Sequence, residues 1–481
     1  MWIALVVACR KDNPDVPVDP DGNTEDSGDT EDTEDTEDTG DLDPPLSVAD
    51  ASAALGPIVE TVVRVSWQQS GDAAVHVEFS FDDDTLASPV RTLAAGAHEE
   101  LLLGVPYDTD VTWRIVAVGA EDTVTTDDLE IRTPPLPEGA PVPDVLFADP
   151  AGYDASQPWL LVSLDTFTDG AYTQIVDRKG RVVWSLRSPA GRWTGYPQLS
   201  VAGDTLLVDH NSLFGAFDGG AAGTVVEMTI DGAEIHTFPT PGLHQSFAGL
   251  PDGSIAYQRA LDDPNPDDTY YNFEDLTQVA RDDTTTVLFD CNAWLDGLLP
   301  GVGCSGNTVW HDPATGNLLL TEYTAETTVE LDATTFEPLR WFGSGYVPGG
   351  WTYDPPESAM VYPHNTHYTE GGTLLVSDFD DRVTFERVLV REYAVDFATE
   401  TLTEIFVTVA PPEVFGIGFG AASRLPNGNT QQNCGMSRLR EVTPENELVW
   451  DVFWPRPGSG FMLMGLSTPL ADLYPLAPDR P

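Results

Sequence analysis

The stretch LPDGSIA at residues 250–256 joins a tight turn to a short apolar strand, and versions of it recur along the chain. Four of the five versions place two or three apolar residues just after a turn glycine. The turn glycines are spaced by 50, 63, 56 and 56 residues, and they are Gly203, Gly253, Gly316, Gly372 and Gly428. Self-similarity at such a period indicates a repeat architecture.

Each repeat unit continues after this turn and strand with a hairpin that has an aromatic residue near its end. Clear examples end in Trp184, Trp341 and Trp450. Four short strands in each unit are typical of a β-propeller blade, because stacking blades around an axis buries both faces of every sheet. One incomplete copy and five clear ones predict a six-bladed β-propeller over residues 138–481. Residues 261–300 are irregular, so a seven-bladed ring with one diverged blade is the alternative.

The composition agrees with an all-β protein and argues against a nucleic-acid binder. The 481 residues include 79 acidic and 22 basic side chains, a formal net charge of −57. Phosphate recognition needs clustered Lys and Arg, which this balance does not offer. The 42 glycines and 39 prolines suit many short strands and turns. No stretch approaches the roughly 20 apolar residues that span a bilayer.

Residues 47–135 predict a small β-sandwich ahead of the propeller. Apolar and polar residues alternate over 62–67, 74–79 and 111–118, and 129–132 closes the unit. Such period-2 runs, separated by Asp and Gly turns, are typical of a β-sandwich. The unit resembles a fibronectin type III or similar immunoglobulin-like module, with Trp67 as a core aromatic residue and a spacer or adhesive role.

The first 46 residues predict an exported protein held on a tether. Residues 1–9 resemble the end of a bacterial lipoprotein signal, in which Cys9 would carry the lipid; an apolar start with an incidental Cys is the alternative. Fifteen Asp or Glu lie between residues 10 and 45, so residues 10–46 predict a disordered acidic tether. We expect the protein in the bacterial periplasm or on the outer membrane or cell surface, contacting the membrane only through that lipid.

The cysteines agree with export. Cys291 and Cys304 lie 13 positions apart across a loop rich in Gly and Asn, and they predict a disulfide. Cys434 is then a leftover thiol. Since there is no CxxC pair, we predict no cysteine zinc site, and we expect no cofactor or metal. The acidic stretch 262–268 allows calcium binding, but solvated loop acids are the better interpretation because no bidentate Glu follows at EF-hand spacing.

Histidines gather just ahead of the turn glycines, where the loops of a propeller converge on one mouth of its channel. Of the six propeller histidines, four lie in this position: His244, His311, His364 and His367. Imidazoles from separate repeats that meet at one rim indicate a functional site rather than a passive scaffold.

Over roughly 300 residues the sequence resembles the bacterial aryl-sulfate sulfotransferases, which are periplasmic six-bladed propellers. Three stretches carry the resemblance: His244 ahead of the LPDG turn, NTVWHDP at residues 307–313, and residues 363–382, which begin PHNT and end DFDDR. The resemblance implies transfer of a sulfuryl group between phenols through a sulfated histidine. The partners would be a small aromatic sulfate ester and a phenol acceptor.

The resemblance also implies a role for each site residue. His364 would be the nucleophile, and His244 would act as acid and base. Asn307 and Arg382 would stabilise the negative charge on the sulfuryl oxygens. The substrate would contact four further side chains: Trp310, Tyr323, His311 and His367.

Two departures from the family leave a second function open. The family has a His two positions before the Asn and an Arg about 16 positions after it, where this chain has Ser305 and Tyr323. His311 also stands where the family usually has Tyr. The alternative is a catalytically decayed propeller that binds a ligand or protein as a cell-surface lipoprotein. A quinone-dependent dehydrogenase is a third interpretation, but it would need more blades with regular Trp repeats.

Overall fold

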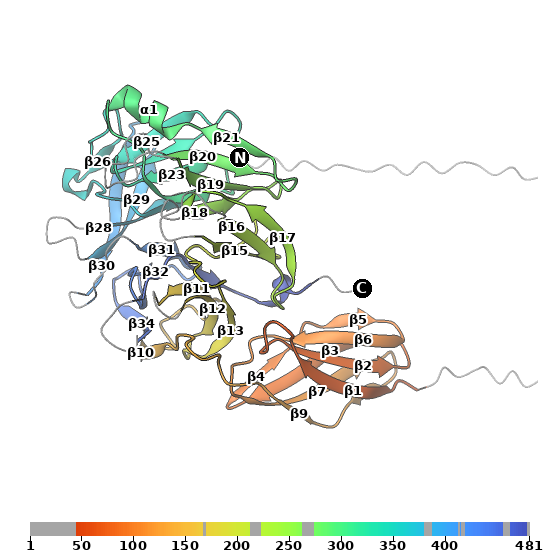
Figure 1. The fold of residues 1–481 in the computed structure, drawn as a ribbon. Helices are drawn as coiled ribbons and strands as arrows, with labels where there is room; N and C mark the ends of the chain where they lie inside the picture. Colours follow the sequence, from red (N-terminus) through yellow and green to blue (C-terminus); the bar gives the residue numbers. More distant parts are fainter. Residues whose placement is uncertain are drawn as a thin grey trace, which may run out of the picture. The chain divides into compact units, whose positions relative to one another are not determined.

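The computed structural model describes residues 45–166, 170–211, 223–261, 274–379, 387–411, 414, 419–455 and 462–478 (Figure 1). These residues are almost entirely β, with one α-helix and two short 3-10 helices at Pro356–Ser358 and Tyr474–Leu476. Within these ranges no helix is long and apolar enough to cross a membrane. Cys9 and the acidic segment that follows it lie outside the described residues.

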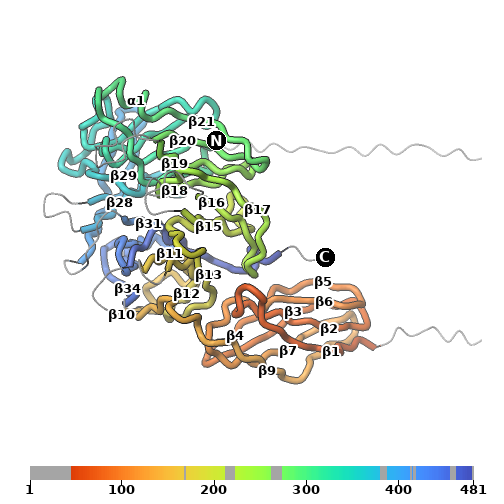
Figure 2. The backbone as a smooth tube through the Cα atoms, viewed as in Figure 1, coloured from red at the N-terminus to blue at the C-terminus, as the bar shows by residue number. Residues whose placement is uncertain are grey.

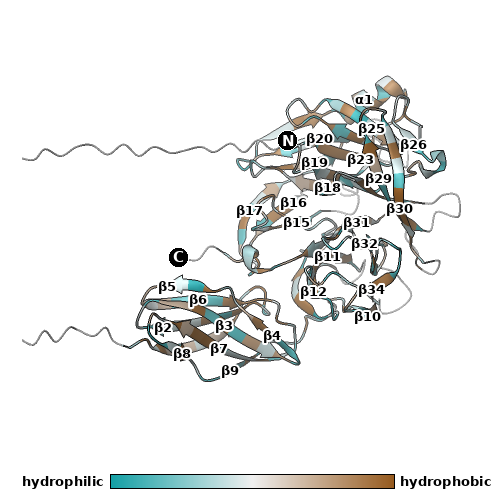
Figure 3. Ribbon diagram, turned by 180° about the vertical axis from the view of Figure 1, so that it is seen from behind, coloured by the Kyte–Doolittle hydropathy of each residue, from teal (hydrophilic) through white to brown (hydrophobic). Residues whose placement is uncertain are grey.

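Two antiparallel sheets with a shared core occupy residues 48–132, which we call the N-terminal sheets. One contains β1 (Val48–Leu55), β2 (Val63–Gln69) and β6 (Gly96–Leu102). The other contains β4 (Asp84–Ala87), β3 (Ala73–Phe81), β7 (Asp110–Val118) and β8 (Thr123–Thr125), with β5 (Arg91–Leu93) on β3 and β9 (Leu129–Arg132) on β7. Figure 3 colours these strands by hydropathy, and their inward residues alternate with outward ones. The predicted strands are confirmed, and Trp67, 3% exposed, lies in the core as predicted.

Six more sheets follow between residues 144 and 470. The first contains β35 (Ser467–Leu470), β11 (Trp159–Asp165), β12 (Ala171–Asp177) and β13 (Val182–Arg187). The second contains β14 (Gln198–Leu199), β15 (Leu206–His210), β16 (Thr224–Met228) and β17 (Glu234–Pro239). The third contains β18 (Leu243–Gly249), β19 (Ile255–Ala260), β20 (Glu274–Val279) and β21 (Thr285–Phe289).

The remaining three sheets continue the pattern. The fourth contains β22 (Gly306–His311), β23 (Leu318–Glu322), β24 (Thr327–Leu331) and β25 (Pro338–Gly343). The fifth contains β27 (Asn365–Tyr368), β28 (Leu374–Phe379), β29 (Val388–Asp396) and β30 (Thr401–Val409), with β26 (Thr352–Asp354) parallel to β30. The sixth contains β31 (Ala421–Arg424), β32 (Thr430–Asn433), β33 (Arg438–Val442) and β34 (Leu448–Phe453), with β10 (Asp144–Ala148) on β34.

The five predicted turn glycines join the first and second strands of five successive sheets. All five have a positive φ, between 73° and 91°. A side chain with a Cβ disfavours this backbone region, so glycine is the natural residue at these turns. The repeated turn is therefore confirmed, and its sequence signal comes from backbone sterics.

Both ends of the described chain complete the arrangement of sheets. Near the C-terminus, β35 pairs with β11, so that Ser467 lies opposite Val162 and Leu470 opposite Trp159. At the other end β10 pairs with β34 of the last sheet. The first sequence copy is incomplete because its first strand comes from the other end of the chain; Figure 2 traces the blue C-terminal segment beside the yellow β11. Strands from the two ends of the described chain thus complete the first and last sheets, an arrangement typical of a β-propeller.

The aromatic residues that end two of the hairpins link neighbouring sheets. Trp184 Nε1 donates to the Ile230 carbonyl of the second sheet at 2.6 Å. Trp450 Nε1, on the last sheet, donates to the Arg178 carbonyl of the first sheet at 3.0 Å. Both indoles are buried. A buried tryptophan usually needs such a partner for its N–H, and here the partner is the next sheet.

The segment between the two cysteines corrects the expectation of a loop. Its first part is the helix α1 (Cys291–Leu298), which begins after Asp290, whose carboxylate accepts from Ala293 N at 2.9 Å. This N-cap bond and the buried Leu295 explain why a short helix forms there. The predicted Cys291–Cys304 disulfide is confirmed, with Cα atoms 6.0 Å apart.

Candidate functional site

His244 lies in an irregular stretch of β18. The pairing of β18 with β19 shifts between Leu243 and Phe247, and Gln245 has φ +57°. Positive φ is uncommon for a residue other than glycine, and a bulge of this kind redirects the neighbouring side chains. The imidazole is buried, and its Nδ1 forms a hydrogen bond with Glu274 Oε1.

Glu274 connects His244 to the next sheet. It is the first residue of β20, and its second carboxylate oxygen accepts from Gly306 N, at the start of β22, at 2.9 Å. A carboxylate can only accept a hydrogen bond, so Nδ1 of His244 carries the hydrogen and the Nε2 lone pair points away from Glu274.

His364 is anchored by a neutral group instead. Its Nδ1 lies 2.9 Å from the Gly420 carbonyl, which can only accept, so Nδ1 carries the hydrogen and Nε2 the lone pair. The imidazole is buried, and the Phe419 ring lies 5.5 Å from it, centroid to centroid. Its backbone N–H donates to the Ser377 carbonyl at 2.8 Å, which fixes the residue at the entrance to β27.

Asn307 joins the two histidines. It follows Gly306 on β22, and its Nδ2 donates to the Pro363 carbonyl, directly before His364, at 2.9 Å. A continuous series of contacts therefore runs from His244 through Glu274, Gly306 and Asn307 to the backbone at His364. We call His244, Glu274, Asn307 and His364 the histidine cluster.

The histidine cluster lies at one end of the first strands of three successive sheets. β18 lies against β22, and β22 against β27. Ser246 Oγ accepts from Val309 N at 3.2 Å, while the rings of Trp310 and His367 lie 4.7 Å apart. Residues contact in the same order along each strand, so the three strands run in the same direction. The cluster residues that begin these strands consequently share one end.

Two tyrosines lie at this same end. Tyr323 N donates to the Ser305 carbonyl at 2.8 Å, just before β22, and the Tyr323 ring stacks on Tyr362 with centroids 5.0 Å apart. Both side chains are half-buried. The sequence predicted Tyr323 as a substrate contact, and the structure adds Tyr362, two residues before His364.

Other predicted contacts lie elsewhere. His311 is the last residue of β22, whereas Asn307 is near its first, and four residue steps along a strand span roughly 13 Å. Trp310 and His367 contact each other, beyond Asn307 along the strands. The structure therefore does not bring these three to the histidine cluster. Arg382 and the acidic stretch 262–268 lie outside the described residues.

Sequence reasoning missed two buried carboxyl groups. Glu274 lies 30 residues from His244 with no motif around it, and only the sheet register brings the two together. Glu322, on β23, is 1% exposed and accepts from Gln258 Nε2 at 3.4 Å. Burial, followed by the charge of Glu274, raises the pKa of Glu322 well above its ordinary value. Burial thus disfavours the charged form of Glu322 beside Glu274.

One group of potential metal ligands occurs among the described residues: Cys291, Cys304 and Glu322. The two sulfurs are joined in the disulfide, so they are not thiolates that could bind a metal.

Comparison with known proteins names no relative. Neither the models of protein families nor the curated proteins contain a match. Solved structures that are similar include a putative 6-phosphogluconolactonase from Bacteroides fragilis, with 12% identity over 63% of this chain and 98% of that chain and a TM-score of 0.37. Another is the periplasmic gluconolactonase PpgL of Pseudomonas aeruginosa, with 14% identity over 63% of this chain and 98% of that chain and a TM-score of 0.39. A third is Hsv2p of Kluyveromyces lactis, with 8% identity over 79% of this chain and 97% of that chain and a TM-score of 0.30.

Proposed function

We propose that this protein is an aryl-sulfate sulfotransferase-like enzyme that moves a sulfuryl group between phenols through a sulfated His364. The observation that carries the proposal is the difference between the two imidazole anchors. His364 Nδ1 faces a neutral carbonyl, and His244 Nδ1 faces a carboxylate. The first arrangement suits a neutral nucleophile, and the second suits a base that is stabilised when it becomes cationic.

In the first half-reaction His364 takes the sulfuryl group. The Nε2 lone pair forms a bond to sulfur while the bond from sulfur to the aryl oxygen breaks. The departing phenolate receives a proton from the imidazolium of His244. Nδ1 of His364 keeps its hydrogen bond to the Gly420 carbonyl, which stabilises the ring as positive charge develops on it.

In the second half-reaction an acceptor phenol takes the group. Its oxygen attacks sulfur, its proton passes to His244 Nε2, and the nitrogen–sulfur bond breaks with its electrons returning to His364. His244 is protonated again and His364 is neutral, so both return to their starting states. Glu274 holds His244 in one orientation through both halves.

The negative charge on the sulfuryl oxygens needs hydrogen-bond donors. Asn307 has two amide N–H groups; one donates to the Pro363 carbonyl, which leaves the other for an oxygen of the transferred group. We assign Arg382 as the cationic donor on the basis of the sequence resemblance. The stacked pair of Tyr323 and Tyr362 offers a flat surface to an aryl ring at the same end.

The rest of the chain completes the proposal. We infer that the six sheets are six blades of one closed propeller over residues 138–481. The shared core of β2, β3, β6 and β7 supports a fibronectin type III-like module over residues 47–135. Residues 10–46 would tether this module to a lipid on Cys9 of an exported protein, and no cofactor is required.

The test is turnover of 4-nitrophenyl sulfate with phenol as acceptor, followed as nitrophenolate release by the purified full chain. We expect His364→Ala to abolish turnover and His244→Ala to lower it by about 10²–10⁴-fold, the usual contribution of a general acid–base. Glu274→Gln keeps the shape of the side chain and should cost roughly 10- to 100-fold. His76→Ala, on β3 of the N-terminal sheets, is the matched control and should retain full activity.

Two results would overturn the proposal. One is full activity in His364→Ala with intact folding. The other is no turnover by the folded wild type over a range of phenol acceptors, which would favour the second function, a propeller that binds a ligand without catalysis.

A further inference from the structure

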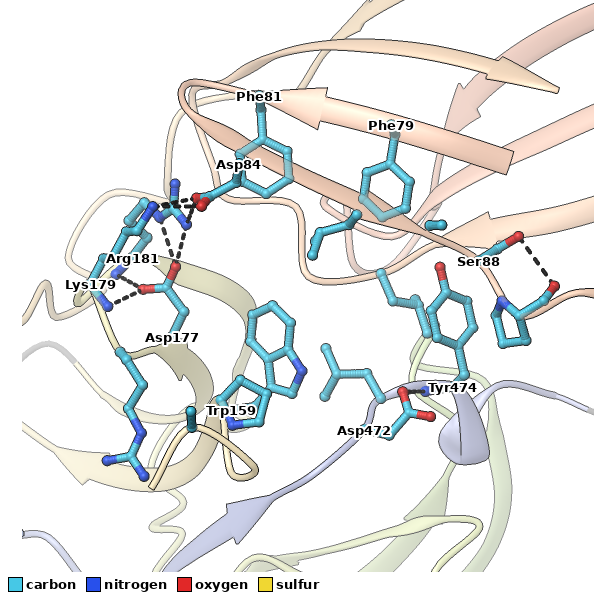
Figure 4. Close-up of a pocket in the computed structure, with 18 of the residues that line it drawn as sticks. Phe79, Phe81, Asp84, Ser88, Trp159, Asp177, Lys179, Arg181, Asp472 and Tyr474 are labelled. Atoms are coloured by element: carbon cyan, nitrogen blue, oxygen red, sulfur yellow. Dashed lines mark hydrogen bonds and ion pairs between the residues drawn. The ribbon is translucent and has the colours of Figure 1, made fainter. Parts of the chain in front are cut away.

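A cleft of about 490 Å³ lies between the N-terminal sheets and the first propeller sheet (Figure 4). Its volume is within the roughly 300–1,000 Å³ of small-molecule sites. Four separate parts of the chain form it: strands β3 and β4 with the residues after them, Leu103 after β6, the first propeller sheet with the loop before it, and residues 472–474. No residue of the histidine cluster lines this cleft.

The two sides of the cleft are fixed to each other. Thr61 Oγ1 donates to the Val183 carbonyl at 2.7 Å, and Tyr107 N donates to the Val182 carbonyl at 3.2 Å. Val59 also belongs to the same buried apolar cluster as the first propeller sheet. Residues 45–481 accordingly form one compact unit, so the cleft exists before any ligand arrives.

Aromatic side chains form one wall of the cleft. Tyr153, Trp159 and Tyr474 are each half-buried. The Trp159 ring is seated on Gly104, where an added Cβ would lie only 2.5 Å from the ring atom Cη2. A glycine at this position lets the edge of the indole come close to the backbone, so the position of the ring is set by packing.

Ion pairs form one edge of the cleft. Lys179 Nζ lies 2.6 Å from Asp84, and the Arg181 guanidinium lies 2.5 Å from Asp84 and 2.6 Å from Asp177. Figure 4 shows this network at one edge, with Trp159 below Phe81 and Tyr474 farther along. Three acidic and three basic side chains line the cleft, so their formal charges cancel.

We propose that this cleft binds a neutral saccharide. A pyranose ring has an apolar face of C–H groups, which packs on an indole, and a belt of hydroxyls, which donate to carboxylates and accept from Lys and Arg. The cleft offers both surfaces on fixed side chains. Because the charges cancel, the cleft disfavours an anion such as a phosphate or sulfate ester. A purely aliphatic ligand is disfavoured too, because it would remove water from the ion pairs without replacing the hydrogen bonds of that water.

The experiment is calorimetric titration of the full chain with five neutral hexasaccharides: maltohexaose, cellohexaose, mannohexaose, xylohexaose and chitohexaose. We expect saturable binding of at least one. Trp159→Phe, which keeps an aromatic ring but shortens the platform, should weaken it at least tenfold. Asp84→Asn should weaken it as well, and because Asp84 is at the rim this variant should fold even if Trp159→Phe does not.

The control is Tyr346→Ala, a 51% exposed aromatic residue of the propeller that does not line the cleft, and it should bind as the wild type does. Three results would overturn the proposal. These are no binding of any of the five sugars at millimolar concentration, binding of a heparin hexasaccharide alone, and sugar binding that neither cleft variant weakens.

Discussion

Each of the two site histidines has one ring nitrogen fixed by its neighbour, and the neighbours differ in charge. A third histidine shows what burial does without such an anchor. His367 is 7% exposed, its Nδ1 has no hydrogen-bond partner among the described residues, and burial lowers its pKa to about 4. A buried imidazole without an anion resists protonation because the charged form is poorly solvated. His367 is therefore a packing residue against Trp310 at neutral pH.

His367 should make the protein sensitive to acid. Its folded pKa lies below the ordinary value of 6.5, so its contribution to stability is full above pH 6.5 and is lost as the pH falls towards 4. Between pH 7 and pH 4 the wild type should lose about 3 kcal/mol of unfolding free energy through His367, since one pKa unit is worth about 1.4 kcal/mol. His367→Phe keeps the ring contact but cannot be protonated, so we expect the variant to lack this loss. Denaturant unfolding at pH 7 and pH 4 measures it. An equal loss in wild type and variant would contradict the assignment.

The buried thiol of Cys434 allows a second test on a single residue. It is fully buried, and burial raises its pKa to about 12. The thiolate is the reactive form, so the folded protein should not react with a thiol reagent at pH 8. In a Cys9→Ser background we expect no labelling until guanidinium unfolds the chain, and then one thiol per molecule. Labelling of the folded protein would show that this core opens.

At the scale of elements, the sequence indicated those features that backbone sterics impose. The five turn glycines have positive φ, and the alternating strands of the N-terminal sheets bury one face, so both leave a pattern. The bulge at His244 leaves none, because its positive φ falls on Gln245 rather than on a glycine. The contact of Glu274 with His244 could not be predicted from the sequence either, since it depends on how β20 is aligned beside β18 and β22. The sequence pattern placed His311 with His364 because both precede a turn glycine. In the structure the two lie at opposite ends of their strands.

The disulfide supports the site through α1. Asn292 Nδ2 donates to the Glu274 carbonyl at 2.8 Å, and Asn292 Oδ1 accepts from Cys304 N at 3.0 Å. Replacing both cysteines of the disulfide with serine should cost roughly 3 kcal/mol of stability, the value for a loop of this length. We also expect lower turnover, because Glu274 loses its support. Thermal unfolding and the nitrophenyl sulfate assay measure the two effects, and an unchanged melting temperature would refute the structural part.

At the scale of the whole molecule, a buried joint connects the first sheet to the last, and the proposed closed ring depends on it. Arg178, at the end of the β12 hairpin, forms an ion pair with Glu441 of β33 at 2.7 Å, and both are buried. Residues 178 and 441 are far apart in sequence, so repeat spacing predicts a closed ring but not the side chains that hold the joint.

Breaking this pair should be costly because the buried Glu441 carboxylate loses its cation and keeps only the neutral donors Asp154 N and Asn429 Nδ2. We expect Arg178→Ala to lower the unfolding free energy by about 3–5 kcal/mol. Arg132→Ala, which removes an exposed arginine paired with Asp108 and Asp110, is the control and should cost at most about 1 kcal/mol. Denaturant unfolding compares the two, and equal losses would mean that the joint does not hold the ring.

The most direct measurement of the central claim is the site of sulfuryl attachment. The full chain is mixed briefly with 4-nitrophenyl sulfate without acceptor, held at alkaline pH, digested, and its peptides are analysed by mass spectrometry. We predict one sulfated residue per chain at His364, removed by adding phenol and absent from His364→Ala. Turnover without any adduct, or an adduct on a different residue, would contradict the assignment.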